Sequence, residues 1–141
     1  MKKQLLILLV IAILALTVAA CGGAKAPVAE APQVDLASLP VDLTVQQVNS
    51  IRNNPDVVLI DVREQWEYDA GHIPNVKLIP LGTLPNRTNE IPKDKFVVMT
   101  CHSGNRSGQA TKFLRDNGFD NVHNMQGGIS EWQKAGFPVE K

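Results

Sequence analysis

Residues 95–118, KFVVMTCHSGNRSGQATKFLRDNG, contain a strand, a loop and a helix in succession. The first six residues are mainly apolar and of strand length, which is typical of a strand buried on both faces of a sheet. From Ser107 onward, Ala110 and Leu114 stand at helical spacing, and Gly118 indicates where the helix ends. A strand that leads into a helix is the repeating unit of α/β folds, so this stretch indicates that fold class.

The same alternation of strands and helices continues through residues 41–141. Thr44 and Gln47 have the spacing of a capping box at the start of a predicted helix over residues 43–54. Further strands are predicted for DVVLIDV (56–62), VKLIPL (76–81) and NVHNM (121–125), and further helices for REQWEYDAGH (63–72) and ISEWQKAG (129–136). Residues 81–92 are predicted to form a weak helix or a loop. The pattern predicts a layered α/β fold with a mainly parallel sheet.

The first 20 residues have the features of a signal peptide. Two lysines precede an apolar run from Leu5 to Ala20. The run ends in VAAC, which resembles the lipobox of bacterial lipoproteins, so Cys21 is expected to carry palmitate or a similar lipid. One alternative is a permanent transmembrane helix, because the run is close to the minimum span of roughly 17 residues. A secreted soluble form is a third option.

Residues 21–40 are rich in Ala and Pro and are predicted to be a flexible tether for a domain over residues 41–141. The positive N-terminus stays in the cytoplasm, so the domain is expected outside it. A lipid anchor places the protein in the cell envelope, at the outer membrane and periplasm or at the outer face of the cell membrane. The sequence leaves open which membrane holds the anchor.

The composition argues against several kinds of partner and ligand. Lys and Arg number 14 and Asp and Glu also number 14, so no nucleic-acid partner is expected. His72, His102 and His123 lack the spacing of paired metal ligands, and no second cysteine lies in the domain, so no metal site is expected. If Cys21 is lipidated, Cys101 has no disulfide partner. An unpaired cysteine in an exported protein is a candidate reactive thiol.

Cys101 lies where a strand ends and a helix is about to begin. Ligand sites of α/β sheets gather at this end of the strands. The loop HSGNR after Cys101 can curl so that its N–H groups point inward and bind an anion, helped by the positive end of the helix. Gly104 supplies an unusual backbone angle, and Arg106 adds a fixed positive charge. These features favour the thiolate. The alternative is a buried cysteine without a role.

Three segments resemble the signatures of the rhodanese homology domain. LIDVREQWEYDAGHIPNVKLIPL (59–81) resembles its N-terminal signature, CHSGNRS (101–107) its active-site loop, and MQGGISEWQKAGFPV (125–139) its C-terminal signature. The resemblance covers nearly all of residues 41–141. It implies a three-layer rhodanese-like fold, in which a central parallel five-stranded sheet has helices on both faces.

The resemblance also implies a sulfurtransferase. Cys101 would take the outer sulfur of an anionic donor such as thiosulfate as a persulfide, and cyanide or a small-molecule or protein thiol would accept that sulfur. No cofactor is implied. The loop residues expected to bind the substrate are His102, Ser103, Gly104, Asn105, Arg106 and Ser107. Their N–H groups would hold the persulfide or the sulfonate oxygens, and Arg106 would orient the donor. The alternative for Arg106 is an exposed residue of the first helical turn.

Other signature residues are expected to support the frame. Asp61 and Arg63 would brace neighbouring loops, although an acid–base role for Asp61 stays open. His72 is expected to make a fixed hydrogen bond, and His102 to face solvent or to tune the thiol. Ser107 would cap the helix, donate to the sulfur, or do both. Four aromatic side chains are assigned to packing: Trp66, Tyr68, Trp132 and Phe137.

Two rival functions remain. Phosphatases and arsenate reductases of this fold have arginine six places after the cysteine, whereas Arg106 lies five places after Cys101. Those phosphatases usually have histidine where this chain has Thr100. A non-catalytic binding or sensing domain is the other rival, but such domains usually lack the cysteine. The physiological donor and acceptor are not determined by the sequence.

Overall fold

The structure, a computed structural model, describes residues 34–141 of the chain. The predicted signal peptide, the lipidation site Cys21 and the tether up to residue 33 lie outside the described residues. Residues 34–40 belong to the same unit as the predicted domain. Among them, Leu36–Ser38 form a short 3₁₀ turn, and Leu36 and Leu39 pack against the core. Within the described part, no helix has both the length and the apolar character to cross a membrane.

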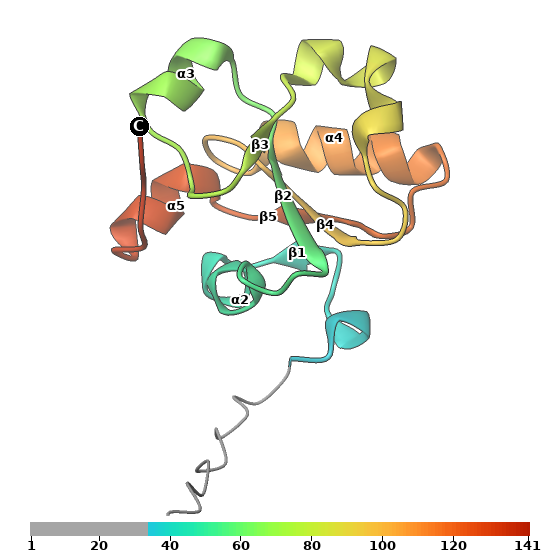
Figure 1. Cartoon of the computed structure of the whole chain (residues 1–141), viewed down its shortest axis with the longest axis horizontal. Helices are drawn as coiled ribbons and strands as arrows, with labels where there is room; N and C mark the ends of the chain where they lie inside the picture. Colours follow the sequence, from blue (N-terminus) through green and yellow to red (C-terminus); the bar gives the residue numbers. More distant parts are fainter. Residues whose placement is uncertain (1–33) are drawn as a thin grey trace, which may run out of the picture. The chain divides into compact units, whose positions relative to one another are not determined.

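A sheet of five parallel strands lies at the centre of the fold (Figure 1). The strands are β1 (Asp42–Leu43), β2 (Val57–Asp61), β3 (Lys77–Leu78), β4 (Phe96–Thr100) and β5 (Val122–Met125). Their order in the sheet is β1-β5-β4-β2-β3, and all neighbours run parallel. The long apolar strands β2 and β4 therefore lie inside the sheet, as the sequence predicted.

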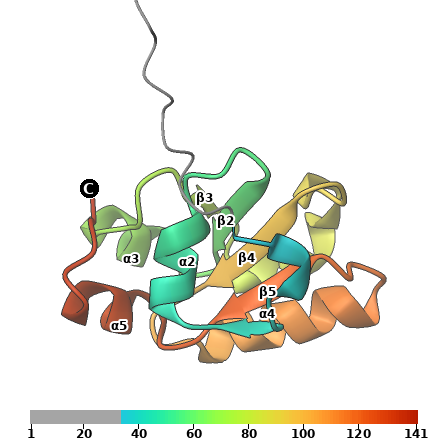
Figure 2. The same ribbon diagram turned by 90° about the horizontal axis from the view of Figure 1, so that it is seen from below.

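Helices cover both faces of this sheet (Figures 1 and 2). The helices are α2 (Val45–Ile51), α3 (Gln65–Ala70), α4 (Asn105–Asp116) and α5 (Gly128–Lys134). The region predicted as a weak helix or a loop forms two 3₁₀ turns, η2 (Leu81–Asn86) and η3 (Thr88–Glu90). The predicted three-layer α/β fold with a parallel five-stranded sheet is confirmed.

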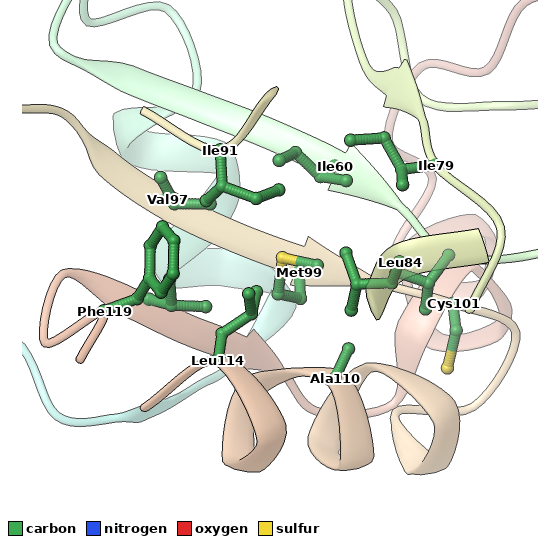
Figure 3. Close-up of a cluster of buried hydrophobic side chains, with 12 residues drawn as sticks. Ile60, Ile79, Leu84, Ile91, Val97, Met99, Cys101, Ala110, Leu114 and Phe119 are labelled. Carbon is green, nitrogen blue, oxygen red and sulfur yellow. The ribbon is translucent and has the colours of Figure 1, made fainter. Parts of the chain in front are cut away.

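Two clusters of buried side chains, one on each face of the sheet, explain which helix covers which face. Ala110 and Leu114 of α4 and Leu84 of η2 pack against Ile60 and Met99, and Figure 3 shows this cluster. On the other face, Val48 of α2 and Trp132 of α5 belong to the second cluster, together with Leu59 and Val98 of the central strands. Successive residues of a strand thus enter different layers, because side chains alternate along it.

Local signals in the sequence agree with the element ends. Thr44 Oγ1 accepts from the Gln47 N–H at 3.2 Å, and Gln47 Oε1 accepts from the Thr44 N–H at 2.9 Å. This is the predicted capping box of α2. After α4, Gly118 has a φ of +82°, so it ends the helix in the left-handed region, where glycine is favoured.

Candidate active site

The site is built around the loop that joins β4 to α4. Cys101 follows the carboxyl end of β4, a central strand, and α4 begins at Asn105. Between them the chain turns sharply, and Gly104 adopts a φ of +96°. This angle is one that residues with a Cβ resist, and it aims the Gly104 N–H at the Cys101 sulfur, 3.1 Å away. The turn therefore folds the loop around the thiol.

The N-terminus of α5 braces the same loop from the other side. The Ile129 N–H donates to the Cys101 carbonyl at 2.8 Å, and the Ser130 N–H donates to the His102 carbonyl at 3.1 Å. A Cβ on Gly128 would lie 2.4 Å from the Cys101 carbonyl oxygen. The two backbones can approach this closely only because residue 128 is glycine, which gives a physical reason for the second glycine of the GG pair in the C-terminal segment.

The thiol is buried rather than open to solvent. Cys101 is 1% exposed and forms part of the first core cluster. Its sulfur lies at the edge of that cluster, as Figure 3 shows. The Gly104 N–H and the Ser107 hydroxyl both point at it, the latter at 3.4 Å. The sulfur therefore lies at the base of a polar loop and against an apolar wall.

Ser107 connects the thiol to the neighbouring strand. Its hydroxyl lies 2.7 Å from Asn124 Oδ1 of β5 and 3.1 Å from the Gly104 carbonyl, in addition to its contact with the sulfur. Asn124 in turn donates through Nδ2 to Asp42 at 2.9 Å. A hydroxyl has one proton, so Ser107 donates to one of these partners at a time. The network holds Ser107 in place beside Cys101.

Burial by itself raises the pKa of the Cys101 thiol. Hydrogen bonds from the Ser107 hydroxyl and from the backbone N–H groups of Ser107, Ser103 and Gly104 lower it and outweigh the burial. The net direction is a pKa below the ordinary cysteine value, so the thiolate fraction near neutral pH is increased. The hydrogen bonds of the loop therefore stabilise the negatively charged form of the Cys101 thiol.

Replacing Ser107 by alanine is expected to raise the pKa of Cys101, because the hydroxyl donor is lost while the burial remains. The thiolate fraction at a given pH then falls, and the rate of alkylation by iodoacetamide rises only at higher pH. Ser103→Ala is the matched control, since Ser103 acts through its backbone N–H and its side chain is exposed. Identical pH profiles for S107A and S103A would contradict the role of the hydroxyl.

Arg106 is not free to act as an isolated positive charge. Its two terminal nitrogens donate to the two carboxylate oxygens of Glu67 at 2.6 and 2.7 Å. The Arg106 bond is the main cause of a lowered pKa of Glu67, to about 2, so this carboxylate is ionised at neutral pH. Glu67 was not predicted as a site residue. It lies 39 positions away in the sequence, and local spacing carries no signal of the pair.

Asp61 and Arg63 form a buried brace beneath α3. Arg63 is 4% exposed and its guanidinium lies 2.7 Å from Asp61, which is 2% exposed. Arg63 also donates to the Glu67 carbonyl at 3.1 Å and to the Gly71 carbonyl at 2.8 Å. The pair therefore ties the end of β2 to the middle of α3, at Glu67, and to the residue that follows α3, at Gly71.

The two histidines of the signature segments have different surroundings. His72 is buried, stacks on Tyr68 with ring centroids 3.7 Å apart, and its Nδ1 lies 3.0 Å from the Tyr68 carbonyl. His102 is exposed, and its Nε2 lies 3.1 Å from the Ser130 hydroxyl. His72 thus makes a fixed hydrogen bond within the frame, while His102 stands at the surface beside the thiol.

A pocket of about 450 Å³ opens beside the loop. Its lining residues are Arg63, Trp66, Glu67, Ala70, Gly71, His102, Arg106, Ile129 and Gln133. Trp66 is 72% exposed, so its assignment to packing is wrong. Tyr68, Trp132 and Phe137 do pack against the second cluster, as predicted. The helix α3 has only six residues, so the spacing of its apolar residues in the sequence could not show that Trp66 faces outward.

Among the predicted loop residues, Gly104 and Ser107 contact the Cys101 sulfur, and His102 and Arg106 line the pocket. The side chains of Ser103 and Asn105 are exposed, and of these two residues only Ser103 directs a backbone N–H at the thiol. Among the described residues, no group of three or more His, Cys, Asp or Glu side chains has the arrangement of a metal site. A cavity of about 620 Å³ beside Phe96 and His123 lies at the opposite end of β4 from the thiol.

Comparisons with known proteins show which sequences and folds this chain is similar to. The chain matches the Rhodanese-like domain over residues 44–135. A sulfurtransferase from Allochromatium vinosum is 40% identical over 89 residues, which are 63% of this chain and 83% of that protein. The tRNA uridine(34) hydroxylase of Cronobacter sakazakii is 36% identical over 118 residues, which are 77% of this chain but only 34% of the hydroxylase. The crystal structure of a rhodanese-related protein from Thermoplasma volcanium has a TM-score of 0.67 and 30% identity, over 72% of this chain and 98% of that one. This chain therefore belongs to the rhodanese-like domain family.

Proposed function

We propose that this protein is a sulfurtransferase that moves sulfane sulfur from thiosulfate or a similar donor to cyanide or a thiol through a Cys101 persulfide. The observation that carries the proposal is the loop's arrangement of donors around one sulfur: the Gly104 N–H points at it from 3.1 Å, the Ser107 hydroxyl lies 3.4 Å away, and the N–H groups of Ser103 and Ser107 also favour its charged form. Such donors stabilise the attacking thiolate and also the negative charge of the persulfide that replaces it. The similarity to the Allochromatium vinosum sulfurtransferase supports this activity.

The chemistry consists of two displacements at sulfur. In the first, the Cys101 thiolate attacks the outer sulfur of thiosulfate, a new S–S bond forms, the donor's S–S bond breaks, and sulfite leaves with the bonding electron pair. In the second, an acceptor nucleophile attacks the outer sulfur of the persulfide, and the Cys101 thiolate is regenerated. Neither displacement requires a redox cofactor. The loop supplies hydrogen bonds to the charged sulfur in both halves.

The test is to expose the purified chain to thiosulfate and, in parallel, to an aryl phosphate. The expected result is a gain in intact mass of one sulfur atom, followed by its loss when cyanide is added. Phosphate hydrolysis without a mass gain would favour the phosphatase alternative. Absence of both reactions with every donor tried would favour a binding or sensing domain.

The location is a separate proposal that rests on residues 1–21 alone. We propose that Cys21 is lipidated and that the domain is held outside the cytoplasm at the cell envelope, because a basic start, an apolar run and VAAC follow one another. Incorporation of labelled palmitate into the wild-type chain and its loss in Cys21→Ser would support the anchor. Equal membrane retention of both chains without labelling would favour an uncleaved transmembrane helix.

A further inference from the structure

The pocket beside the loop is much larger than a small anionic donor requires. It measures about 450 Å³, and a thiosulfate ion would fill only a small part of it. Cys101 is 1% exposed and does not line the pocket, which reaches the loop at His102 and Arg106. A donor whose body lies in the pocket would extend a terminal sulfur past these two residues to reach the thiol.

The guanidinium that should hold an anionic donor already has a partner. Both terminal nitrogens of Arg106 are bound by Glu67 at 2.6 and 2.7 Å. The Glu67 side chain is 12% exposed, so water screens this pair only in part. A carboxylate at this distance cancels the charge of the arginine for any ligand that lies farther away.

Glu67 is also held in place from the other side. The Glu64 N–H donates to Glu67 Oε2 at 3.1 Å as part of the cap of α3. Displacing Glu67 from Arg106 would therefore disturb the helix start as well. The second arginine at the pocket, Arg63, is paired with Asp61 at 2.7 Å. Both arginines that line the pocket are thus neutralised by acidic partners.

The rest of the lining offers apolar surface to an uncharged organic group. Trp66 is 72% exposed and offers an open ring at the pocket, Ala70 adds a small apolar side chain, and the neighbouring polar side chains His102 and Gln133 add no fixed charge. A large aromatic ring is seldom left exposed beside a reactive site unless it binds something. Such a ring binds ligand groups by burying apolar surface and by stacking on other rings. The pocket therefore combines an apolar wall with neutralised charges.

We propose that the preferred donor is an organic persulfide, R–S–SH, whose uncharged R group lies against Trp66, and that Glu67 is the residue that disfavours the thiosulfate dianion. This inference rests on the proposed sulfur transfer and specifies its substrate class. The Cys101 thiolate attacks the terminal sulfur of R–S–SH, the new S–S bond forms as the donor's S–S bond breaks, and R–S⁻ leaves with the electron pair. The terminal sulfur keeps its proton, so Cys101–S–SH is the product.

The test compares kcat/KM for thiosulfate and for benzyl persulfide, which has an uncharged aromatic R group. Wild type is expected to favour benzyl persulfide. Glu67→Gln frees the charge of Arg106, so the ratio of thiosulfate to persulfide kcat/KM is expected to rise about tenfold. Asp69→Asn removes the same charge from the same helix, but Asp69 bonds to Gln65 rather than to Arg106. It is the matched control and should leave the ratio unchanged.

Trp66→Ala provides a second, independent measurement. It removes the aromatic wall and should also raise the ratio, this time through a loss of about tenfold in kcat/KM for benzyl persulfide. A wild-type preference for thiosulfate, or a fall of the ratio in E67Q, would overturn the inference while leaving sulfur transfer intact. If neither donor adds a sulfur atom to Cys101 in the wild-type protein, the proposed function itself fails.

Discussion

Replacing Cys101 by serine is expected to reduce sulfur transfer by at least about 10³-fold, because the nucleophile and the carrier of the persulfide are lost together. The fold should remain, since the exchange replaces one sulfur atom by oxygen at the end of β4. The new hydroxyl can still accept from the Gly104 N–H, which lies 3.1 Å from the sulfur in the native protein. A stability change within about 1 kcal/mol is expected.

Two measurements separate the chemistry from the fold. Intact mass after exposure to the donor reports whether a persulfide forms, and circular dichroism during urea unfolding reports the free energy of unfolding. Ser103→Ala, on the same loop with an exposed side chain, serves as the control and should keep its activity. Transfer at the wild-type rate by C101S would remove Cys101 from the mechanism. An unfolded C101S would show instead that the thiol is needed mainly for packing in the core.

The second large effect is expected at the buried brace. Arg63→Met should destabilise the protein by about 3–5 kcal/mol, because it leaves the carboxylate of Asp61 buried without its charged partner. Asp61 is 2% exposed, so water cannot replace the guanidinium. The carbonyls of Glu67 and Gly71 lose their donors at the same time. Urea unfolding gives the difference in the free energy of unfolding.

Lys95→Met is the matched control for this substitution. Lys95 and Asp56 lie 2.7 Å apart, the same separation as Arg63 and Asp61, but their side chains are 34% and 67% exposed. Loss of such a surface pair is expected to change stability by less than about 1 kcal/mol. If both variants lose the same amount of stability, burial does not distinguish the two pairs, and the buried brace has no special role in holding α3.

Most of the fold could be predicted from local patterns. The apolar runs of β2 and β4 are long enough to indicate buried strands, and the Thr44–Gln47 capping box marks the start of α2. The edge strand β1 was not predicted from any pattern, because its two residues are too few to show alternation. It forms only because β5 offers an open edge, with Asp42 opposite Asn124.

The candidate site, like the fold, could be predicted from the sequence only in part. The loop from Cys101 to Ser107 was recognisable because its residues are consecutive, and a strand end, a glycine and a helix start can be identified in a short stretch. Glu67 and Asn124 were not predicted. Each meets the loop across a sequence gap, of 39 positions to Arg106 and 17 to Ser107, and their contacts depend on where α3 and β5 are packed.

The sequence by itself thus determined the class of fold, the position of the thiol at the end of a central strand, and the anion-binding turn that follows it. These properties depend on neighbouring residues and on backbone angles, which local composition specifies. Only the tertiary structure decided that Arg106 is neutralised by Glu67, that Trp66 is exposed at the pocket, and that α5 braces the loop. Charge pairing and exposure are properties of distances in space, and those distances exist only after the helices have packed on the sheet.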